Sequence, residues 1–275
     1  MRVDETRFRE IAETTLEWTK RARGPEAIER TVDAYAQFTT EVNMAQARYE
    51  IAGEYEHKSY QEVYESHYSQ QAGMSDYLWG VYLTNFLWAH HMEIWRRFDI
   101  EFVSQLPRGA QLVEIAPGHG YWGTWALHHR SDLTLQGYDI SSASIQIASQ
   151  TAAAAGVSDR ASYTECNALD LVKTPGDSAD AAICCFLLEH LEEPGRLFSV
   201  IHHLLRPGGK AFVTGALTAA QVDHIYEFRR ESELMRMAED AGLHVSQTVS
   251  SKPKRTLPNA KFVPRSMMLL VTKPE

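Results

Sequence analysis

The stretch Val113-Glu114-Ile115-Ala116-Pro117-Gly118-His119-Gly120-Tyr121-Trp122-Gly123 decides the expected fold. A short apolar run ends in an acid and passes into a glycine-rich turn, after which residues 125–129 can continue as a helix. A strand, a tight turn and the start of a helix bring backbone N–H groups close to a bound nucleotide-like ligand. Glycine suits this turn because a side chain would block the approach and because some turn positions require positive φ.

A second acid follows about one strand and one helix later. Residues 135–140 read as another short strand, and Asp139 stands near its end. An acid at the tip of the second strand is placed to accept hydrogen bonds from ribose hydroxyls. Together the two stretches predict a site for an adenosine-bearing cofactor.

Two cofactor classes fit the glycine-rich turn. Gly118, Gly120 and Gly123 satisfy the dinucleotide fingerprint Gly-x-Gly-x-x-Gly. The position of the turn argues against NAD, because it follows a long helical region, whereas a dinucleotide-binding domain usually opens with its fingerprint. Glu114 argues the same way, since it would face a diphosphate badly but suits an ammonium group. The loop instead resembles the acid-x-Gly-x-Gly-x-Gly loop of class I S-adenosylmethionine-dependent methyltransferases, with Ala116 replacing the first glycine.

The resemblance continues in chain order over residues 92–273. Asp139 matches the acid that binds the ribose, and Asn167 takes the place of the polar residue that reaches the adenine amine. Residues 180–191 resemble the fourth strand and its active-site tip, and residues 204–213 resemble the turn into the fifth strand. The Leu-Glu-His-Leu sequence at that tip is common in the branch that methylates quinones and other small molecules.

The resemblance implies S-adenosylmethionine as the cofactor and S-adenosylhomocysteine as the product. The residues that it implies for cofactor binding are Glu114, Ala116, Gly118, His119, Gly120, Asp139, Ile140, Asn167, Ala168 and Phe186.

Alternating strand and helix signals up to about Leu205 predict a parallel, doubly wound sheet. We expect one helix over residues 84–105, before the first strand, and another over residues 226–241. Residues 243–246 and 266–271 would be the last two strands, which form a hairpin in the family. The expected fold class is therefore α/β, a Rossmann-like doubly wound seven-stranded sheet with an N-terminal helical cap.

Residues 1–91 are expected to form the helical cap or lid, and residues 92–275 the cofactor-binding core. Helical patterns cover residues 4–22 and 26–52, and seven of the twelve tyrosines fall within residues 49–82. These aromatic side chains either fill the interior of the cap or present phenol groups to a substrate, and the two interpretations are compatible. The residues expected to contact the substrate are Tyr64, Tyr68 and Tyr226.

Methyl transfer from a sulfonium is an in-line displacement whose leaving thioether needs no proton. The enzyme therefore supplies mainly proximity, alignment and exclusion of water, and a general base is needed only when the acceptor must lose a proton. Glu189, His190 and His224 are the candidate catalytic residues, because they follow the fourth and fifth strands. His119 in the glycine loop is a further candidate for the base. For each of them, the more common role of such a residue is structural, as a helix cap, a buried hydrogen-bond partner or a surface residue.

Composition excludes several other classes of protein. The formal net charge of −9 disfavours a nucleic-acid partner. No window approaches the ~20 apolar residues of a membrane span, and the N-terminus lacks the apolar core of a signal peptide. Three cysteines, two of them adjacent in an expected core strand, indicate a reducing compartment, so we expect a cytoplasmic protein.

No metal site is expected from the histidine pattern. Adjacent side chains on a helix point about 100° apart, so a histidine doublet cannot chelate one ion. The doublets are His90-His91, His128-His129 and His202-His203. The sequence also lacks the His-Glu-x-x-His pattern of zinc proteases and the Gly-x-Ser-x-Gly elbow of hydrolases.

The sequence therefore predicts an S-adenosylmethionine-dependent methyltransferase that acts on a small, aromatic or heterocyclic metabolite in secondary metabolism. The acidic charge and the aromatic cap favour a neutral or cationic substrate. Two alternatives stay open, an NAD-dependent oxidoreductase on the same type of core and a non-catalytic module that keeps the cofactor pocket. Neither the methylated atom nor the oligomeric state follows from the sequence, and a homodimer is one option.

Overall fold

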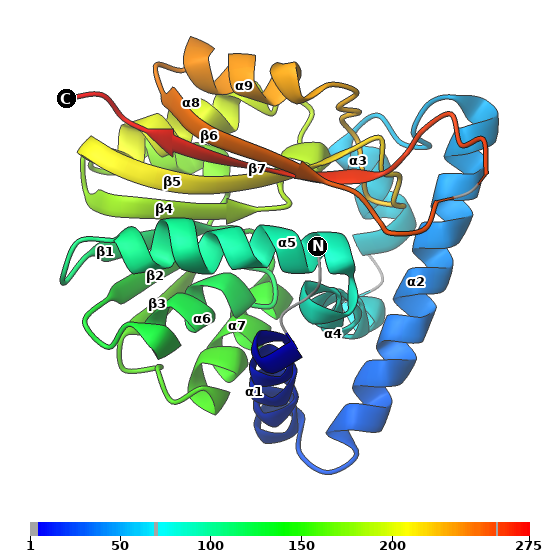
Figure 1. Ribbon diagram of the computed structural model, residues 1–275, viewed down its shortest axis with the longest axis horizontal. Coiled ribbons are helices and arrows are strands. Elements are labelled where there is room, and N and C mark those ends of the chain that lie inside the picture. Colours follow the sequence, from blue (N-terminus) through cyan, green and yellow to red (C-terminus); the bar gives the residue numbers. More distant parts are fainter. Residues whose placement is uncertain (1–4, 69–70, 257) are drawn as a thin grey trace.

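The computed structural model describes residues 5–68, 71–256 and 258–275, with the backbone alone for residues 67–68 and 71–74. Its centre is a seven-stranded sheet with the order β3-β2-β1-β4-β5-β7-β6 (Figure 1). The strands are β1 Gln111–Ile115, β2 Thr134–Asp139, β3 Ala161–Glu165, β4 Ala179–Cys185, β5 Leu205–Leu217, β6 His244–Ser251 and β7 Arg265–Thr272. The first five run parallel, whereas β7 is antiparallel to both β5 and β6. The predicted Rossmann-like α/β sheet and its final hairpin are confirmed.

Helices cover both faces of the sheet, with α5, α6 and α7 on one face and α8 and α9 on the other (Figure 1). The α-helices are α1 Glu5–Arg23, α2 Ala27–Ala52, α3 Tyr60–Val63, α4 Gln71–Leu87, α5 Ala89–Arg97, α6 Tyr121–His129, α7 Ser142–Ala154, α8 Gly195–Leu204 and α9 Glu231–Asp240. Short π- or 3₁₀-helical segments lie at Tyr64–Tyr68, Phe98–Phe102, Val103–Gln105, Ala168–Lys173 and Leu188–His190. Among the described residues, none of these helices combines the length and the apolar character that crossing a membrane requires.

Two expected helices differ from the prediction in their boundaries. The helix expected over residues 84–105 is interrupted at Trp88, whose extended backbone (φ −94°, ψ 117°) separates α4 from α5. The helix expected over residues 226–241 begins only with α9, because the preceding segment runs beside the end of β5. There Phe228 forms an isolated parallel bridge with Leu217 and is fully buried, and this contact with the sheet keeps the backbone extended.

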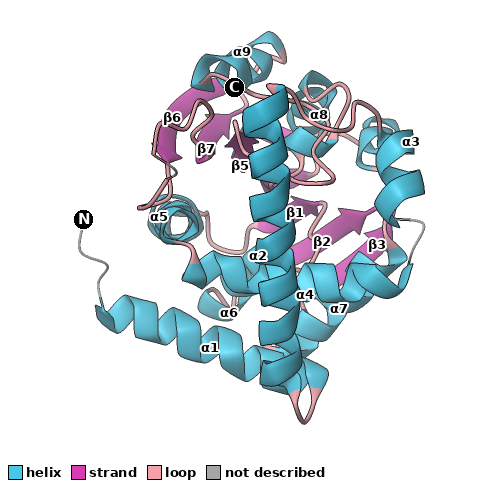
Figure 2. Cartoon of the chain, turned by 90° about the vertical axis from the view of Figure 1, so that its right-hand side faces the viewer, coloured by secondary structure: helices cyan, strands magenta, loops and turns pink. Residues whose placement is uncertain are grey.

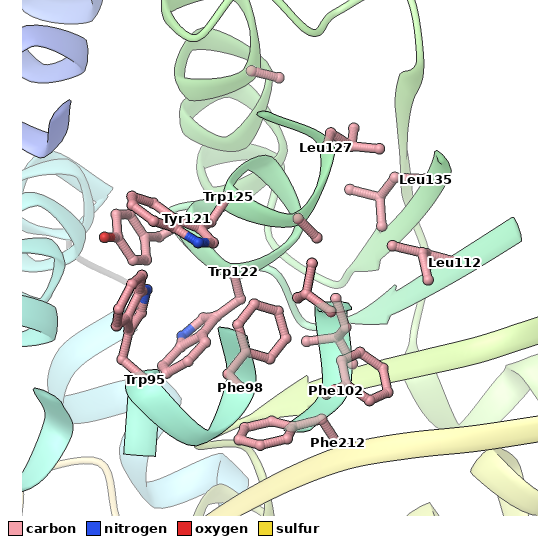
Figure 3. Packing of buried hydrophobic residues seen from close by; sticks show 14 of the residues in the cluster. Trp95, Phe98, Phe102, Leu112, Tyr121, Trp122, Trp125, Leu127, Leu135 and Phe212 are labelled. Carbon is pink, nitrogen blue, oxygen red and sulfur yellow. The ribbon is translucent and has the colours of Figure 1, made fainter. Parts of the chain in front are cut away.

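Aromatic side chains fill the core under α5 and α6 (Figure 3). Trp95 lies 4.6 Å from Trp125, and Phe98 lies 5.1 Å from Trp122, measured between ring centroids. Phe212 of β5 approaches Phe98 to 5.1 Å. Fully buried aromatic rings remove a large apolar area from water, so this cluster holds α6, and with it the loop that precedes α6, firmly on the sheet.

The N-terminal helices continue this packing over the ends of the strands. Trp18 of α1 lies 6.1 Å from the ring of Trp125. Figure 2 shows α2 crossing in front of the sheet. It packs closely on α4, because a Cβ added at Gly80 would stand only 2.7 Å from the carbonyl oxygen of Ala34. Glycine at that position therefore lets the two helix backbones approach each other at the carboxyl edge of the sheet.

Candidate active site

A cavity of about 1750 Å³ opens at the carboxyl ends of the parallel strands. Its walls come from α2, the loop after β1, the tips of β2 and β4, and residues 219–225 after β5. Open α/β sheets bind ligands at this edge, where the strand order reverses, and here β1 and β4 flank the reversal. A pocket for one ligand typically measures ~300–1,000 Å³, so the cavity has room for a cofactor and a second molecule.

The loop after β1 turns sharply through residues with a left-handed backbone. Ala116, Gly118 and Gly120 have φ values of 52°, 54° and 71°. The N–H of Ala116 donates to the carbonyl of Tyr138 at 2.8 Å, which ties the loop to the neighbouring strand. An L-residue pays roughly 1–2 kcal/mol for this conformation, so alanine at the first loop position stores backbone strain beside the cavity.

Glu114 lies under the loop with one oxygen bonded and one oxygen without a partner. The side chain is 2% exposed, and its Oε1 accepts a hydrogen bond from the N–H of Gly123 at 3.1 Å. Its Oε2 accepts no hydrogen bond from any described residue. Burial raises the pKa of Glu114 to about 8. A cationic group that binds in the cavity near Glu114 would therefore lower this pKa and form an ion pair with the carboxylate.

His119 and Gly120 occupy different surroundings although they are adjacent. His119 is buried in the cavity wall, and its Nδ1 accepts a hydrogen bond from the N–H of Tyr121 at 3.2 Å. Burial lowers the pKa of His119 to about 3, so the ring is neutral and its Nδ1 is engaged. Gly120 does not line the cavity within the described structure; a Cβ there would stand 2.7 Å from Ala148. Its lack of a side chain serves the contact with α7.

Asp139 at the tip of β2 supports the same loop. It is 7% exposed. Its Oδ2 accepts a hydrogen bond from the N–H of Gly118 at 3.0 Å, and its Oδ1 accepts one from the N–H of Ser141 at 2.9 Å. Burial raises the pKa of Asp139, and these two hydrogen bonds oppose the rise. The carboxylate therefore lines the cavity while it fixes the loop.

The remaining predicted adenosine contacts lie along the neighbouring wall. Ile140 is 52% exposed and faces the cavity, which Asn167 and Ala168 also line. Asn167 precedes the 3₁₀ segment, and its Oδ1 accepts a hydrogen bond from the N–H of Leu169 at 2.9 Å. The structure thus brings an apolar surface and an oriented amide to the wall beside Asp139.

Phe186 follows β4 with a left-handed backbone, φ 55°. Its N–H donates to the Oγ1 of Thr214 at 2.9 Å, and its ring stacks on His91 with centroids 4.8 Å apart. A bulky residue with positive φ is a backbone outlier, and such strain is concentrated at functional sites. His91 was not among the expected site residues, because nothing in the sequence places the start of α5 beside the tip of β4.

The three candidate catalytic residues come together although they lie on two segments. Glu189 contributes a carboxylate oxygen, and His190 and His224 each contribute a ring nitrogen. These three atoms all lie within 4.8 Å of one another. The segments are joined by the backbone carbonyl of Glu189, which accepts hydrogen bonds from the N–H groups of Ile225 and Tyr226 at 2.8 and 2.9 Å. The carboxyl edge of the sheet therefore gathers these side chains in one corner of the cavity.

Backbone carbonyls orient both histidines of this corner. The Nδ1–H of His224 donates to the carbonyl of Ala219 at 2.7 Å, and the Nδ1–H of His190 donates to the carbonyl of Asp223 at 3.0 Å. Burial lowers the pKa of His224 to about 3, and burial also raises the pKa of Glu189. Asp223 accepts a second hydrogen bond, at Oδ2, from the hydroxyl of Tyr77 at 2.7 Å.

The tyrosines of residues 49–82 supply both packing groups and cavity walls. The ones that line the cavity are Tyr60, Tyr64 and Tyr77. The ones that are buried and outside the cavity lining of the described structure are Tyr49, Tyr55 and Tyr82. The side chain of Tyr68, a predicted substrate contact, lies outside the described residues.

Tyr226 is the predicted substrate contact that the structure places elsewhere. It does not line the cavity within the described structure, and its ring lies 4.7 Å from that of Phe228 on the other face of the sheet. The extended backbone that buries Phe228 also turns Tyr226 toward this second core. The wall formed by α2, which includes Phe38 and Val42, was not expected, because an amphipathic pattern does not show which edge of the sheet a helix covers.

The strand order and the left-handed loop after β1 agree with the Rossmann-like core that was expected. Residues 113–211 match a family model described as a methyltransferase domain. This match and the strand order agree with the resemblance to class I S-adenosylmethionine-dependent methyltransferases that the sequence motifs indicated.

Individual relatives resemble parts of the chain. The ubiquinone biosynthesis O-methyltransferase of Pseudomonas syringae pv. tomato is 27% identical over 135 residues, which are 42% of this chain and 57% of the relative. The chain therefore spans little more than half the length of the curated relatives that it matches.

Solved structures share the fold at low sequence identity. Phosphoethanolamine N-methyltransferase 2 of Haemonchus contortus, in complex with S-adenosylmethionine, is 16% identical with a TM-score of 0.58, over 79% of this chain and 60% of that one. The [4+2]-cyclase SpnF is 17% identical with a TM-score of 0.53, over 65% of this chain and 80% of that one. One fold thus carries proteins named for different reactions, so these structures establish the fold and leave the reaction to be argued from the site.

Proposed function

We propose that this protein transfers a methyl group from S-adenosylmethionine to a small acceptor in the same cavity. The observation that carries this proposal is that one cavity holds both the loop after β1 with Asp139 and the polar corner of Glu189, His190 and His224. The methyltransferase-domain match over residues 113–211 supports it. So does the likeness to a fold neighbour whose structure contains S-adenosylmethionine.

The proposed cofactor contacts follow from the position of each group in the cavity wall. Asp139 would bind the ribose hydroxyls, since each carboxylate oxygen can accept more than the one hydrogen bond it already has. The Oε2 of Glu114 would pair with the ammonium group, and Ile140 and Asn167 would contact the adenine. The proposed set is completed by Ala116, Gly118, His119, Ala168 and Phe186, which line the cavity, and by Gly120, which would act only through the shape of the loop.

The reaction breaks the bond between the methyl carbon and sulfur and forms a bond between that carbon and the acceptor. The electron pair stays on sulfur, so S-adenosylhomocysteine leaves as a neutral thioether. The protein contributes alignment and exclusion of water. In this proposal Glu189, His190 and His224 hold the polar atoms of the acceptor next to the methyl group.

We assign the acceptor to small aromatic or heterocyclic metabolites of secondary metabolism. Phe38 and Trp88, stacked with centroids 5.9 Å apart, and Tyr35 line the cavity. Flat apolar walls of this kind suit a planar ligand. We also assign residues 1–91 to a cap over the core of residues 92–275, because α2 and α3 contribute to the cavity lining.

Calorimetric titration with S-adenosylhomocysteine and with NAD tests the proposal. We expect the first ligand to bind and the second not to bind. The variant Asp139→Ala should bind at least tenfold more weakly, because two charge-assisted hydrogen bonds worth roughly 1.5–3 kcal/mol each are lost. Asp240→Ala, on the exposed surface of α9, is the control.

The other outcomes select the alternatives. Binding of NAD alone would favour the oxidoreductase. Binding of S-adenosylhomocysteine without methylation of any compound in a broad panel of aromatic and heterocyclic acceptors would favour the non-catalytic module.

A further inference from the structure

The polar corner of the cavity has the donor set of a metal site. Glu189, His190 and His224 each offer one atom within 4.8 Å of the other two, and all three residues line the cavity. Two imidazoles and one carboxylate are a recurring set of protein ligands for zinc and for non-haem iron, in which further coordination positions stay open.

The hydrogen bonds of the two histidines favour this interpretation. A carbonyl oxygen can only accept, so the bonds to Ala219 and Asp223 assign the ring proton of each histidine to Nδ1. In the neutral form of each ring, Nε2 therefore carries the lone pair that a metal needs. Histidines that bind metals usually donate their other N–H to a carbonyl or carboxylate, which fixes the ring.

Glu189 provides the independent observation. The residue is 1% exposed, and its Oε2 accepts no hydrogen bond within the described part of the chain. Leaving a buried polar atom without a partner costs free energy, and the cost is greater when the group is charged. A cation bound by this carboxylate and the two imidazoles would compensate the buried group.

The surrounding contacts give the corner an outer layer. Asp223 is 2% exposed. Its backbone carbonyl accepts a hydrogen bond from the Nδ1–H of His190, and its Oδ2 accepts one from the hydroxyl of Tyr77. Its Oδ2 also lies 3.6 Å from the Nδ1 of His190. This negative residue lies behind the histidine and would strengthen it as a ligand.

We propose that Glu189, His190 and His224 bind one divalent first-row transition-metal ion, of the zinc or iron(II) type, in this corner of the cavity. The two imidazoles disfavour magnesium and calcium, which prefer sites built from oxygen ligands. No metal site was expected from the sequence, because neighbouring histidines on a helix cannot chelate one ion. This set instead joins the 3₁₀ segment after β4 to the loop after β5.

The role of the ion rests on the proposed function, whereas its binding does not. An ion with open coordination positions binds ligands that carry oxygen atoms and lowers the pKa of a bound hydroxyl. The acceptor class that fits is therefore a small molecule with a hydroxyl and a neighbouring oxygen atom that can bind the same ion. Such a hydroxyl would give its proton to solvent and attack the methyl carbon as an oxyanion.

Titration of chelator-treated protein with Co²⁺, followed by visible absorption and calorimetry, tests the site. We expect one Co²⁺ per chain and ligand-field bands of a low-coordinate N/O site. Glu189→Gln, His190→Gln and His224→Gln should each weaken binding at least tenfold. Glu239→Gln and His244→Gln, on exposed positions, should leave it unchanged. Co²⁺ should also raise the melting temperature of the unmodified protein, a readout that does not depend on the folding of any variant.

The outcomes separate this inference from the proposed function. S-adenosylhomocysteine binding, measured on the same samples, should persist in all three ligand variants. No stoichiometric Co²⁺ binding, or equal binding by all variants, would overturn the metal site even if methyl transfer is found. Stoichiometric Co²⁺ binding that requires these three residues would uphold the site even if S-adenosylhomocysteine does not bind.

Discussion

Glu114 and Gly123 are coupled, since the N–H of Gly123 donates to the Glu114 carboxylate at 3.1 Å and leaves no room for a side chain between them. A Cβ on residue 123 would stand 2.3 Å from the Oε2 of Glu114 and 2.5 Å from Leu135. The third glycine of the Gly-x-Gly-x-x-Gly pattern therefore serves the packing of α6 on the buried acid. A pattern that is shared with dinucleotide-binding proteins has here a local steric cause.

Replacing this glycine should destabilise the protein. We expect Gly123→Ala to lower the free energy of unfolding by about 1–3 kcal/mol, the usual cost of overpacking a core. Urea denaturation followed by circular dichroism measures this change. Gly195→Ala is the matched control, because the nearest atom to its added Cβ is the Cγ of Met237 at 3.9 Å. Equal stability of the two variants would contradict the steric argument.

Cofactor binding should release protons from Glu114. The pKa of this buried carboxyl is raised to about 8 in the free protein, and a cationic ammonium nearby would lower it. At pH values between the pKa of Glu114 in the complex and about 8, binding must release a proton from this carboxyl. The affinity for S-adenosylhomocysteine should therefore rise with pH and level off above pH 8. Calorimetry at pH 7 in buffers of different ionisation enthalpy counts the released protons.

Glu114→Gln provides the control for this proton release. The variant has no proton to lose, so its binding should be weaker and its release near zero. Identical proton release by the variant and the unmodified protein would show that another group titrates.

Replacing Ala116, at the first position of the loop, with glycine should not lower the free energy of unfolding. Ala116 has φ 52°, so Ala116→Gly relieves a strain of roughly 1–2 kcal/mol. The added freedom of the unfolded chain offsets about 0.4–1 kcal/mol of that gain. We therefore expect an unfolding free energy equal to or slightly above that of the unmodified protein. Ala153→Gly, at an exposed position inside α7, should instead lose about 0.5–1 kcal/mol. Equal losses at both positions would argue against strain at Ala116.

The sequence predicted the loop after β1 well because its chemistry is local. A buried strand, an acid and closely spaced glycines can form only a few backbone shapes, and Asp139 follows at the spacing of the next strand. The proximity of Glu189 and His224 could also be predicted from the sequence, since the carboxyl ends of parallel strands lie at one edge of the sheet. The order of strands and helices along the chain is enough to predict that these residues lie near one another.

Other features of the site depend on contacts that no local pattern encodes. The hydrogen bond from His224 to the Ala219 carbonyl is set by the course of the loop after β5. Tyr226 turns away from the cavity because Phe228 is held against the end of β5. The stacking of Phe186 on His91 depends on how α5 packs against the sheet. Side-chain direction and partner choice follow from tertiary packing, so they required the structure.

Ligand binding should slow hydrogen exchange in the segment that contains α3. Tyr60 and Tyr64 line the cavity and are 40% and 45% exposed, so a ligand that contacts them would cover them and order the short helix. Closure of such a segment expels water and aligns an acceptor with the methyl group. We expect peptides covering residues 59–66 and the loop at 114–120 to gain protection with S-adenosylhomocysteine and an acceptor. Peptides from α9 serve as the control. Protection confined to residues 113–190 would show that α3 is structural packing or an oligomer contact, and that acceptor specificity lies after β5.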